Sequence, residues 1–439
     1  MKFKIILPFI LLCMLTSTFS QAAETLSSLV EAALANNPEL KSSQARWQMY
    51  TSKARQAGAL EEPMFMLKLQ SLLARQPFSL GGNDPATAKV IGITQQLPFW
   101  GKRAIRQEVA QFEAESYRWQ VEERRLELTR MVKETWYQIY GVDKSLEILE
   151  KNIRIIADFV TIAESRYSVG QGVQQDIFKA GLEKSKMLDM QIALQQQRKS
   201  LAANLNYLLY RSNDLPVDTI ADFDIPPLSH SARQLNETAY EKRPQIKSLI
   251  QLSNKGMASH RLAQKEFYPD FNLSFEYMFR EASMSDPGYN MFTLGVTFNL
   301  PFQRERRQAM LAESSSEAGM AIEELNALKN SISYAINDTL AQMERRLKLI
   351  ELYKGGIIPQ AEQSLESAVI SYRVGKVDFL SLLDGRVTLF NYERELYLSK
   401  AEYMMQLARL EATVGFDSVQ LPVPPQSGAE GSKSEHLMQ

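Results

Sequence analysis

Two segments of this chain, about 205 residues apart, carry nearly the same pattern of residues. The tetrapeptide YSVG at 167–170 returns as YRVG at 372–375, and the tripeptide LPF at 97–99 returns at 300–302. A repeat of this length is two copies of one structural unit, because solenoid repeats are only about 20–50 residues long. The sequence therefore predicts two similar halves that lie side by side.

The N-terminus has the pattern of an export signal. Lys2 and Lys4 precede the apolar stretch 5–15, and small residues at 20–23 suit a cleavage site. The length of 439 residues allows about two or three domains. The predicted organisation is a signal peptide at 1–23, a first repeat at 24–211, a linker at 212–231, a second repeat at 232–415 and a disordered tail at 416–439.

Composition and residue spacing argue against an enzyme, a metal site, a cofactor and a nucleic-acid partner. The formal net charge is -1, and the only cysteine, Cys13, lies in the predicted signal peptide. The three histidines, His230, His260 and His436, lack the spacing of metal ligands. The sequence shows no glycine-rich phosphate loop and no pair of nucleophile and base. A non-catalytic protein without a cofactor is therefore predicted.

Most of each half has the pattern of long helices. Residues 26–58 are predicted to be helical with an interruption at Pro38. Residues 102–167 contain no proline, and one helix of that length would be on the order of 100 Å long. A tip at about 167–176 then leads into a returning helix. A soluble domain is rarely so long in one direction.

Apolar residues at alternating spacings of three and four predict coiled-coil hairpins. In the first half this seam consists of Leu146, Leu149, Ile153, Ile156 and Val160, and the returning helix is its expected partner. The second half repeats the seam in a helix that starts near Gln303 and ends at a tip at about 372–384. A kink or break is expected at Gly355, Gly356 and Pro359.

Two pairs of strands are predicted, within about 62–98 and about 267–301. In the second pair apolar and polar residues alternate, and each strand is about long enough to cross a bilayer at a tilt. The alternative is an amphipathic hairpin packed on a soluble core. The density of aromatic residues favours lipid contact for the apolar positions Phe271, Leu273, Phe275, Tyr277, Phe279, Phe292, Leu294, Val296 and Phe298.

Lipid contact implies a closed barrel, because every backbone group in hydrocarbon must be paired. Four strands are too few, since membrane barrels start at about eight strands. Two copies of the chain would give eight strands and three would give twelve, and the polar residues of the opposite face favour three. The predicted fold is mainly α with a small β part, in which helical hairpins extend a shared transmembrane barrel. The alternative is an exported coiled-coil scaffold without a pore.

The duplicated order of motifs resembles the TolC family of outer-membrane efflux proteins. The resemblance rests on NNPEL at 36–40, QLPF at 96–99, NLPF at 299–302 and the two tips, and it extends over about 24–415. It implies a homotrimer with a twelve-stranded barrel in the outer membrane of a Gram-negative bacterium and a periplasmic α-helical barrel. It also implies a periplasmic adaptor and an inner-membrane pump, for which the RND type is one candidate. Cargo would pass through without chemical change.

In that family the tips form the closed periplasmic entrance, ringed by acidic residues. Asp176 and Asp384 match tip acids, Tyr372 matches a tip tyrosine, and Ser381 stands where some members carry another acid. The departure at Ser381 argues against a double acidic ring. The expected tip residues are Tyr167, Gly170, Asp176, Tyr372, Gly375, Ser381 and Asp384.

Basic residues follow each strand pair, at the start of the next long helix. Cations at a helix N-terminus oppose the macrodipole, so contact with anionic lipid headgroups is one explanation and a solvated surface is the other. The expected junction residues are Pro98, Lys102, Arg103, Arg106, Pro301, Arg304, Arg306 and Arg307.

Methionines gather near the predicted strands. Thioether sulfur suits soft cations such as Cu(I), whereas the simpler explanation is that methionine fills lipid or packing space. The segment 96–103, QLPFWGKR, also resembles the branch of the family that exports heavy metals. The methionines concerned are Met64, Met66, Met278, Met284 and Met291.

Overall fold

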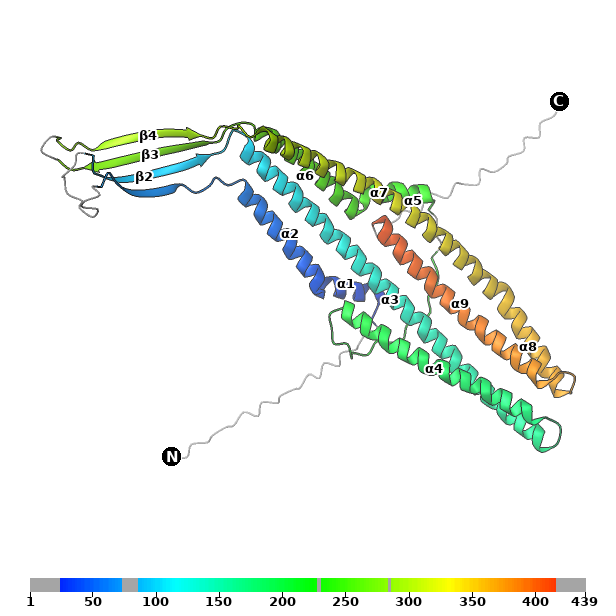
Figure 1. Ribbon diagram of the computed structural model, residues 1–439. Coiled ribbons are helices and arrows are strands. Elements are labelled where there is room, and N and C mark those ends of the chain that lie inside the picture. The colour runs from blue at the N-terminus through cyan, green and yellow to red at the C-terminus, as the bar shows by residue number, and fades with distance from the viewer. Residues whose placement is uncertain (1–23, 73–85, 227–229, 283–285, 416–439) are drawn as a thin grey trace, which may run out of the picture.

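The computed structural model describes residues 24–72, 86–226, 230–282 and 286–415. The predicted signal peptide, the predicted tail, Met284 and His436 lie outside these residues. The described part is long and narrow, with a four-stranded sheet at one end and two helical tips at the other (Figure 1).

The first half contains four helices and two strands in its described part. The predicted interruption at Pro38 is present, and Asn37 separates the two helices. Asn37 caps the second helix, because its Oδ1 accepts hydrogen bonds from the N–H groups of Glu39 and Leu40. Pro38 has no N–H and takes the first helical position without cost. The elements are α1 (Leu26–Asn36), α2 (Pro38–Ala57), β1 (Met64–Gln70), β2 (Ala88–Leu97), α3 (Lys102–Ser168) and α4 (Gln174–Leu208).

The second half repeats this order. The expected irregularity at Gly355 and Gly356 is a π-helical turn, Tyr353–Ile357, which lets one helix run into the next. Pro359 lies in the first turn of the following helix. The elements are α5 (Ala232–Lys242), α6 (Pro244–Lys265), β3 (Phe271–Arg280), β4 (Met291–Phe298), α7 (Arg304–Leu352), α8 (Ile358–Arg373) and α9 (Phe379–Val414).

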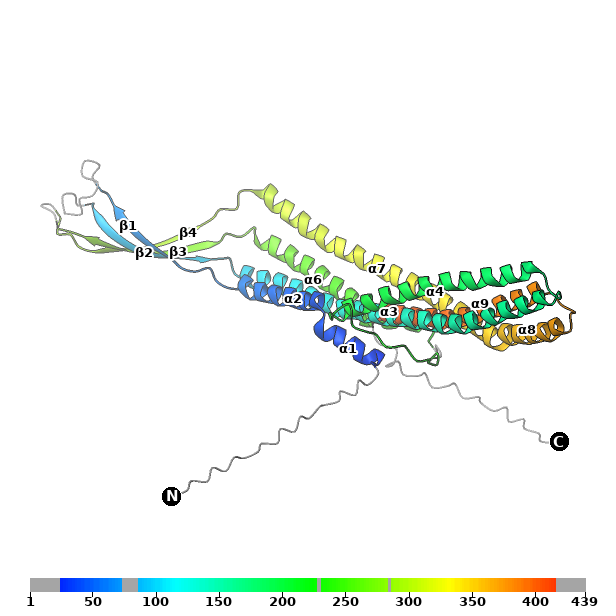
Figure 2. The ribbon, with the colours of Figure 1, turned by 90° about the horizontal axis from the view of Figure 1, so that it is seen from below.

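The predicted seam of α3 is buried only in part, and it has two partners rather than one. Leu149 and Ile156 are fully buried, in a cluster that contains Met187 of α4 together with Leu383 and Phe390 of α9. The two hairpins therefore share one core near their tips. The turned view in Figure 2 shows α3, α4, α8 and α9 running together toward that end.

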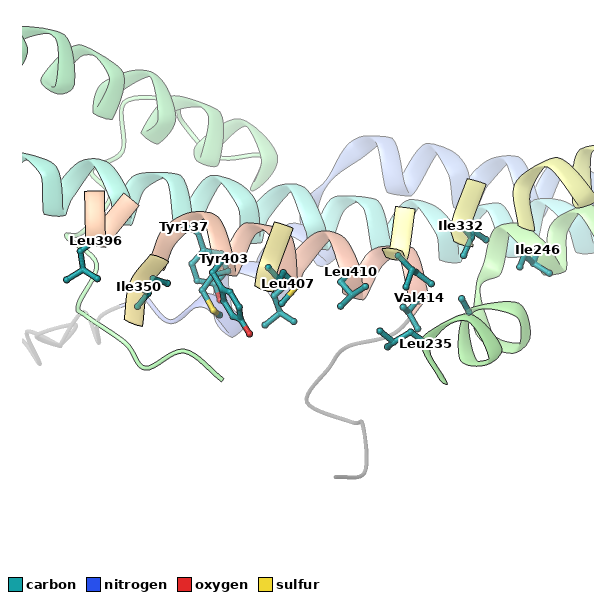
Figure 3. Packing of buried hydrophobic residues seen from close by; sticks show 14 residues of the cluster. Tyr137, Leu235, Ile246, Ile332, Ile350, Leu396, Tyr403, Leu407, Leu410 and Val414 are labelled. Atoms are coloured by element: carbon teal, nitrogen blue, oxygen red, sulfur yellow. The ribbon is translucent and has the colours of Figure 1, made fainter. Parts of the chain in front are cut away.

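Farther from the tips, α9 lies at the centre of the packing. Its apolar side chains, among them Tyr403 and Leu407, contact α3, α5 and α7 (Figure 3). Tyr403 is almost completely buried and donates its hydroxyl to the carbonyl of Pro226. Burial of this kind stabilises the fold by about 1.5–3 kcal/mol for each large side chain.

The predicted linker is packed against both hairpins, and we call its segment 212–226 the strap. Asp222 accepts hydrogen bonds from Tyr140 of α3 and from the buried Lys400 of α9. Arg198 of α4 donates to the strap carbonyl of Val217 at 2.6 Å. The strap thus joins three long helices.

The four strands form one antiparallel sheet in the order β1-β2-β3-β4. The halves meet where β2 pairs with β3, for example at Ile93 opposite Phe275. Within the described chain β1 and β4 are the edge strands, and each has one side without a partner strand. None of the helices in this part of the chain combines the length and the apolar character needed to cross a membrane.

Candidate functional site

The strand register places most of the large apolar residues of the four strands on one side of the sheet. Ile93 lies between Phe65 and Phe275, and Leu294 is opposite Phe275 on the next strand. We call this side the apolar face. Its members are Phe65, Leu67, Leu69, Ile91, Ile93, Leu97, Phe271, Leu273, Phe275, Tyr277, Phe279, Phe292, Leu294, Val296 and Phe298.

The apolar face is open, although it carries the large apolar side chains. Leu67 is 74% exposed and Leu294 is 69% exposed, whereas Val90 on the opposite side of the sheet is only 2% exposed. A soluble sheet buries its apolar side and solvates the other. The reversed arrangement, over a patch of fifteen such residues on four strands, is typical of a surface that meets lipid or another apolar surface.

The sheet continues into the helices through exposed aromatic residues. Trp100 is 76% exposed and Phe302 is 81% exposed, just beyond the ends of β2 and β4. Phe99 stacks on Tyr268 with ring centroids 4.5 Å apart. Aromatic side chains at such a position are typical of a membrane–water interface. Pro98 and Pro301, the expected junction residues, are both half-buried here.

Lys102 corrects one of the expectations for the junction. Its side chain is buried, and its ammonium group donates to Glu266 at 3.0 Å, to Asp270 at 2.9 Å and to the carbonyl of Tyr268. Burial alone would raise the pKa of Asp270, but the N–H of Phe99 and the Lys102 ammonium outweigh it and hold that pKa below its usual range. Lys102 therefore orients the sheet on the helices and does not contact headgroups.

The other basic residues of the junction divide into two groups. Arg106 pairs with Glu266, Arg307 donates to the carbonyl of Glu266, and Arg103 donates to the carbonyl of Gly58. Arg304 and Arg306 are exposed. Arg103 is exposed as well, so three of these side chains have surface available for lipid headgroups.

The two tips have the same backbone geometry. Gly170 and Gly375 have φ values of 74° and 72°, which side-chain-bearing residues rarely adopt. In each tip the glycine N–H bonds to the carbonyl three residues earlier, and the next N–H bonds to the carbonyl five residues earlier. This is a Schellman helix end, and it explains why the YxVG motif occurs twice.

The tip tyrosines differ, although the motif is shared. Tyr167 is 48% exposed, whereas Tyr372 is buried under the Arg166 guanidinium, which lies 4.2 Å from its ring centroid. The same Arg166 donates to the Tyr372 carbonyl at 3.0 Å. Burial raises the pKa of the Tyr372 hydroxyl. Arg166 of one hairpin thus caps the last helical turn of the other.

The expected tip acids lie on different helices. Asp384 is exposed in α9, and Asp176 is in the first turn of α4, where burial and the nearby Asp378 raise the pKa of its carboxyl group. Ser381 is exposed, and its N–H bonds to Asp378 at 2.8 Å. Sequence reasoning missed Asp378 and Arg166. An aspartate at a helix N-cap accepts a hydrogen bond from the N–H group three residues later, and this pattern could have indicated Asp378.

The described residues contain no group of three His, Cys, Asp or Glu side chains that could hold a metal ion. His260 contacts the hydroxyl oxygens of Ser314 and Ser315 at 3.2 and 3.1 Å. The features that stand out are therefore surfaces, namely the apolar face and the two tips.

Both halves of the chain match one known protein family. The family model described as "Outer membrane efflux protein" matches this chain twice, at 29–209 and 235–415. The two matches correspond to the two structural halves described above.

Relatives and solved structures agree with this assignment. The chain is 24% identical to the cobalt-zinc-cadmium resistance protein CzcC of Cupriavidus metallidurans, covering 66% of this chain and 68% of CzcC. It is 22% identical to the outer membrane efflux protein BepC of Brucella suis, over 83% and 79% of the two chains.

Among solved structures, the outer membrane protein VceC of Vibrio cholerae superposes with a TM-score of 0.75 at 20% identity, over 89% of this chain and 96% of VceC. CusC also gives a TM-score of 0.75, at 17% identity, over 90% and 93%. These likenesses show the fold, and the family model covers most of the chain. The chain therefore belongs to the outer membrane efflux protein family, whose place is the outer membrane of Gram-negative bacteria.

Proposed function

We propose that this protein is the outer-membrane channel of a tripartite efflux system, a passive trimeric conduit from the periplasm to the cell exterior. One observation carries the proposal: an open apolar face at one end of a long molecule and two exposed tips at the other. The first surface suits hydrocarbon, and the distance between the ends suits a protein that continues from the membrane into the periplasm.

The edge strands support the proposed trimer. Hydrocarbon offers no hydrogen-bonding partners, so the free edges of β1 and β4 must pair with other copies of the sheet. Three copies supply twelve strands, enough to enclose a polar passage about the axis. The opposite side of the sheet carries Thr94, Ser274 and Thr293, which suit water.

The tips would form the periplasmic entrance and meet a periplasmic adaptor and an inner-membrane pump, with the RND type as a candidate. Support comes from the exposed apolar residues Val169, Val173 and Val374, which a protein partner could cover. Arg166 links the two hairpins at this end and would keep them together while the entrance is closed.

The proposed cargo is small molecules or metal cations, and two likenesses point to metal cations. The name of CzcC specifies resistance to cobalt, zinc and cadmium, and segment 96–103 resembles the heavy-metal branch. A deletion strain complemented with this chain, together with its own adaptor and pump, should regain resistance to at least one metal cation.

Planar-bilayer recording tests the conduit directly. The mature chain, extracted from outer membranes in detergent, should migrate as a heat-sensitive oligomer and produce discrete conductance steps. A detergent-free soluble monomer without conductance would contradict the channel and favour the scaffold.

A further inference from the structure

All four methionines of the described strands lie on the side of the sheet opposite the apolar face. Met64 and Met66 lie in β1, Met278 in β3 and Met291 in β4, and within these strands they point to the side opposite the apolar-face residues next to them. Methionine is an apolar side chain and would be expected on the lipid side. Its confinement to the polar side therefore needs a reason other than filling lipid space. We call these four residues the thioether patch.

The patch extends across the sheet. Met278 and Met291 are direct partners between β3 and β4. Met66 is opposite Gly92, and Gly92 is opposite Glu276, two residues before Met278. A Cβ placed on Gly92 would lie 3.1 Å from the Met66 methyl carbon and 3.2 Å from Cγ of Glu276. The missing side chain at Gly92 thus lets Met66 and Glu276 approach each other.

The patch also advances along the strands. Register places Met64 level with Ser274, Met66 level with Glu276, and Met291 level with Met278. Successive levels are two residues apart, which is about 7 Å along a strand. The sulfur-bearing side chains therefore form three steps along the axis of the sheet.

Thioether sulfur is a soft ligand that selects Cu(I) and Ag(I) over harder divalent cations, and a carboxylate adds negative charge. We propose that the thioether patch, with Glu276, is a low-affinity binding surface for soft monovalent metal cations on the lumen side of the sheet. The inference rests on the proposed channel, because it places this side of the sheet toward the passage.

Nearby positively charged side chains favour the release of a bound metal ion. Lys68 lies 4.0 Å from the Glu276 carboxylate, and Arg280 Nη1 donates to the Met291 sulfur at 3.8 Å. An incoming ion must displace the Arg280 contact, and it meets the repulsion of two positive side chains. Asp286 pairs with Arg280 and offsets part of that charge. A bound ion is therefore held weakly enough to move on.

Silver titration of the reconstituted protein tests the proposal. The mature chain in lipid nanodiscs should bind Ag(I), measured by competition with a chromogenic silver ligand, and Zn(II) should not displace the silver. Replacement of Met66, Met278 and Met291 by leucine keeps the apolar volume and removes the sulfur. The affinity should fall by more than about tenfold, because loss of even an outer-sphere partner typically weakens a metal site about 10–100-fold.

The matched control replaces Met257 and Met320 with leucine. Both are exposed helical methionines, 48% and 58% exposed, and lie away from the strands. This control should bind silver as the parent does. Equal silver affinity in the triple leucine variant, or no binding by the parent, would overturn the proposal. Planar-bilayer conductance of the same samples separates this outcome from a failure of the channel, since the leucine variants should still conduct.

Discussion

A buried lysine at the start of the longest helix shows how individual residues are constrained in this protein. Lys102 places a positive charge where the α3 dipole is also positive, which is unfavourable by itself. Glu266 and Asp270 compensate it from the end of α6 and the start of β3. They are 164 and 168 residues away along the chain, so no local pattern indicated them.

Replacing Lys102 with methionine should destabilise the junction. The carboxylates of Glu266 and Asp270 would lose their shared partner, and removing one member of a buried ion pair costs about 3–5 kcal/mol. The thermal dissociation temperature of the detergent-solubilised oligomer should fall clearly. Arg306→Met is the matched control, because Arg306 is exposed at the start of α7 and its loss should change little. Equal temperatures for the two variants would contradict the role given to Lys102.

Asp222 in the strap should make stability sensitive to acid. Burial works to raise its pKa, but hydrogen bonds from Lys400, Tyr140 and the Phe223 N–H leave the pKa below the usual value of 3.8. The folded pKa is depressed, so the stabilisation is present above pH 3.8 and is lost as the pH falls through the lower folded pKa.

The test compares thermal unfolding of the parent and of Asp222→Asn from neutral pH downward. The parent should be the more stable protein near neutral pH, and the difference should shrink below the usual aspartate range. A difference that does not change with pH would show that the charge of Asp222 has no part in holding the strap.

At the scale of the element, the sequence was most informative where a backbone conformation requires a particular residue type. The glycines of the YxVG motif predicted both tips, and Pro38 predicted the break between α1 and α2. The apolar seam predicted that α3 packs in a hairpin. It could not show that α9 shares that seam, because an apolar pattern defines a buried face and not which helix covers it.

Substitution of Gly375 by alanine should destabilise the second tip through its backbone alone. No atom lies within 4 Å of a Cβ built there, so the cost is the left-handed conformation, about 1–2 kcal/mol for a residue with a side chain. Gly375→Asn should cost less, because asparagine tolerates that conformation. Local hydrogen exchange at the end of α8 reports the difference. Equal protection in the two variants would show that the left-handed backbone conformation at Gly375 is not the source of the cost.

Loss of the Arg166 side chain should loosen the contact between the hairpins. Arg166→Ala removes both the hydrogen bond to the Tyr372 carbonyl and the contact with the Tyr372 ring. If the tips form the entrance, the mean conductance in planar bilayers should rise. Arg154→Ala, an exposed change on the same helix, is the control. Unchanged conductance for Arg166→Ala would show that this contact does not help to close the entrance.

At the scale of the whole molecule, the sequence could predict which surfaces are apolar but not which other segments or chains contact them. Strand alternation alone placed the aromatic residues of β3 and β4 on one face, and the register then brought β1 and β2 into line with them. The headgroup role of Lys102 was wrong, because its partners come from distant parts of the chain. The number of copies in the barrel depends on contacts between chains, and it stays a prediction.

A charge placed on the apolar face distinguishes a lipid-facing sheet from one that packs on protein. Leu294→Arg puts a guanidinium on that face near the middle of β4, where contact with hydrocarbon would cost about 2–4 kcal/mol. Thr293→Arg is the matched control, since the neighbouring residue is also exposed but lies on the opposite side of the sheet. The first change should lower the amount of assembled oligomer in the outer membrane, and the second should leave assembly intact. The two substitutions add the same side chain to adjacent residues. If both variants assemble as well as the parent does, the apolar face does not meet lipid, and the barrel would then have to be abandoned.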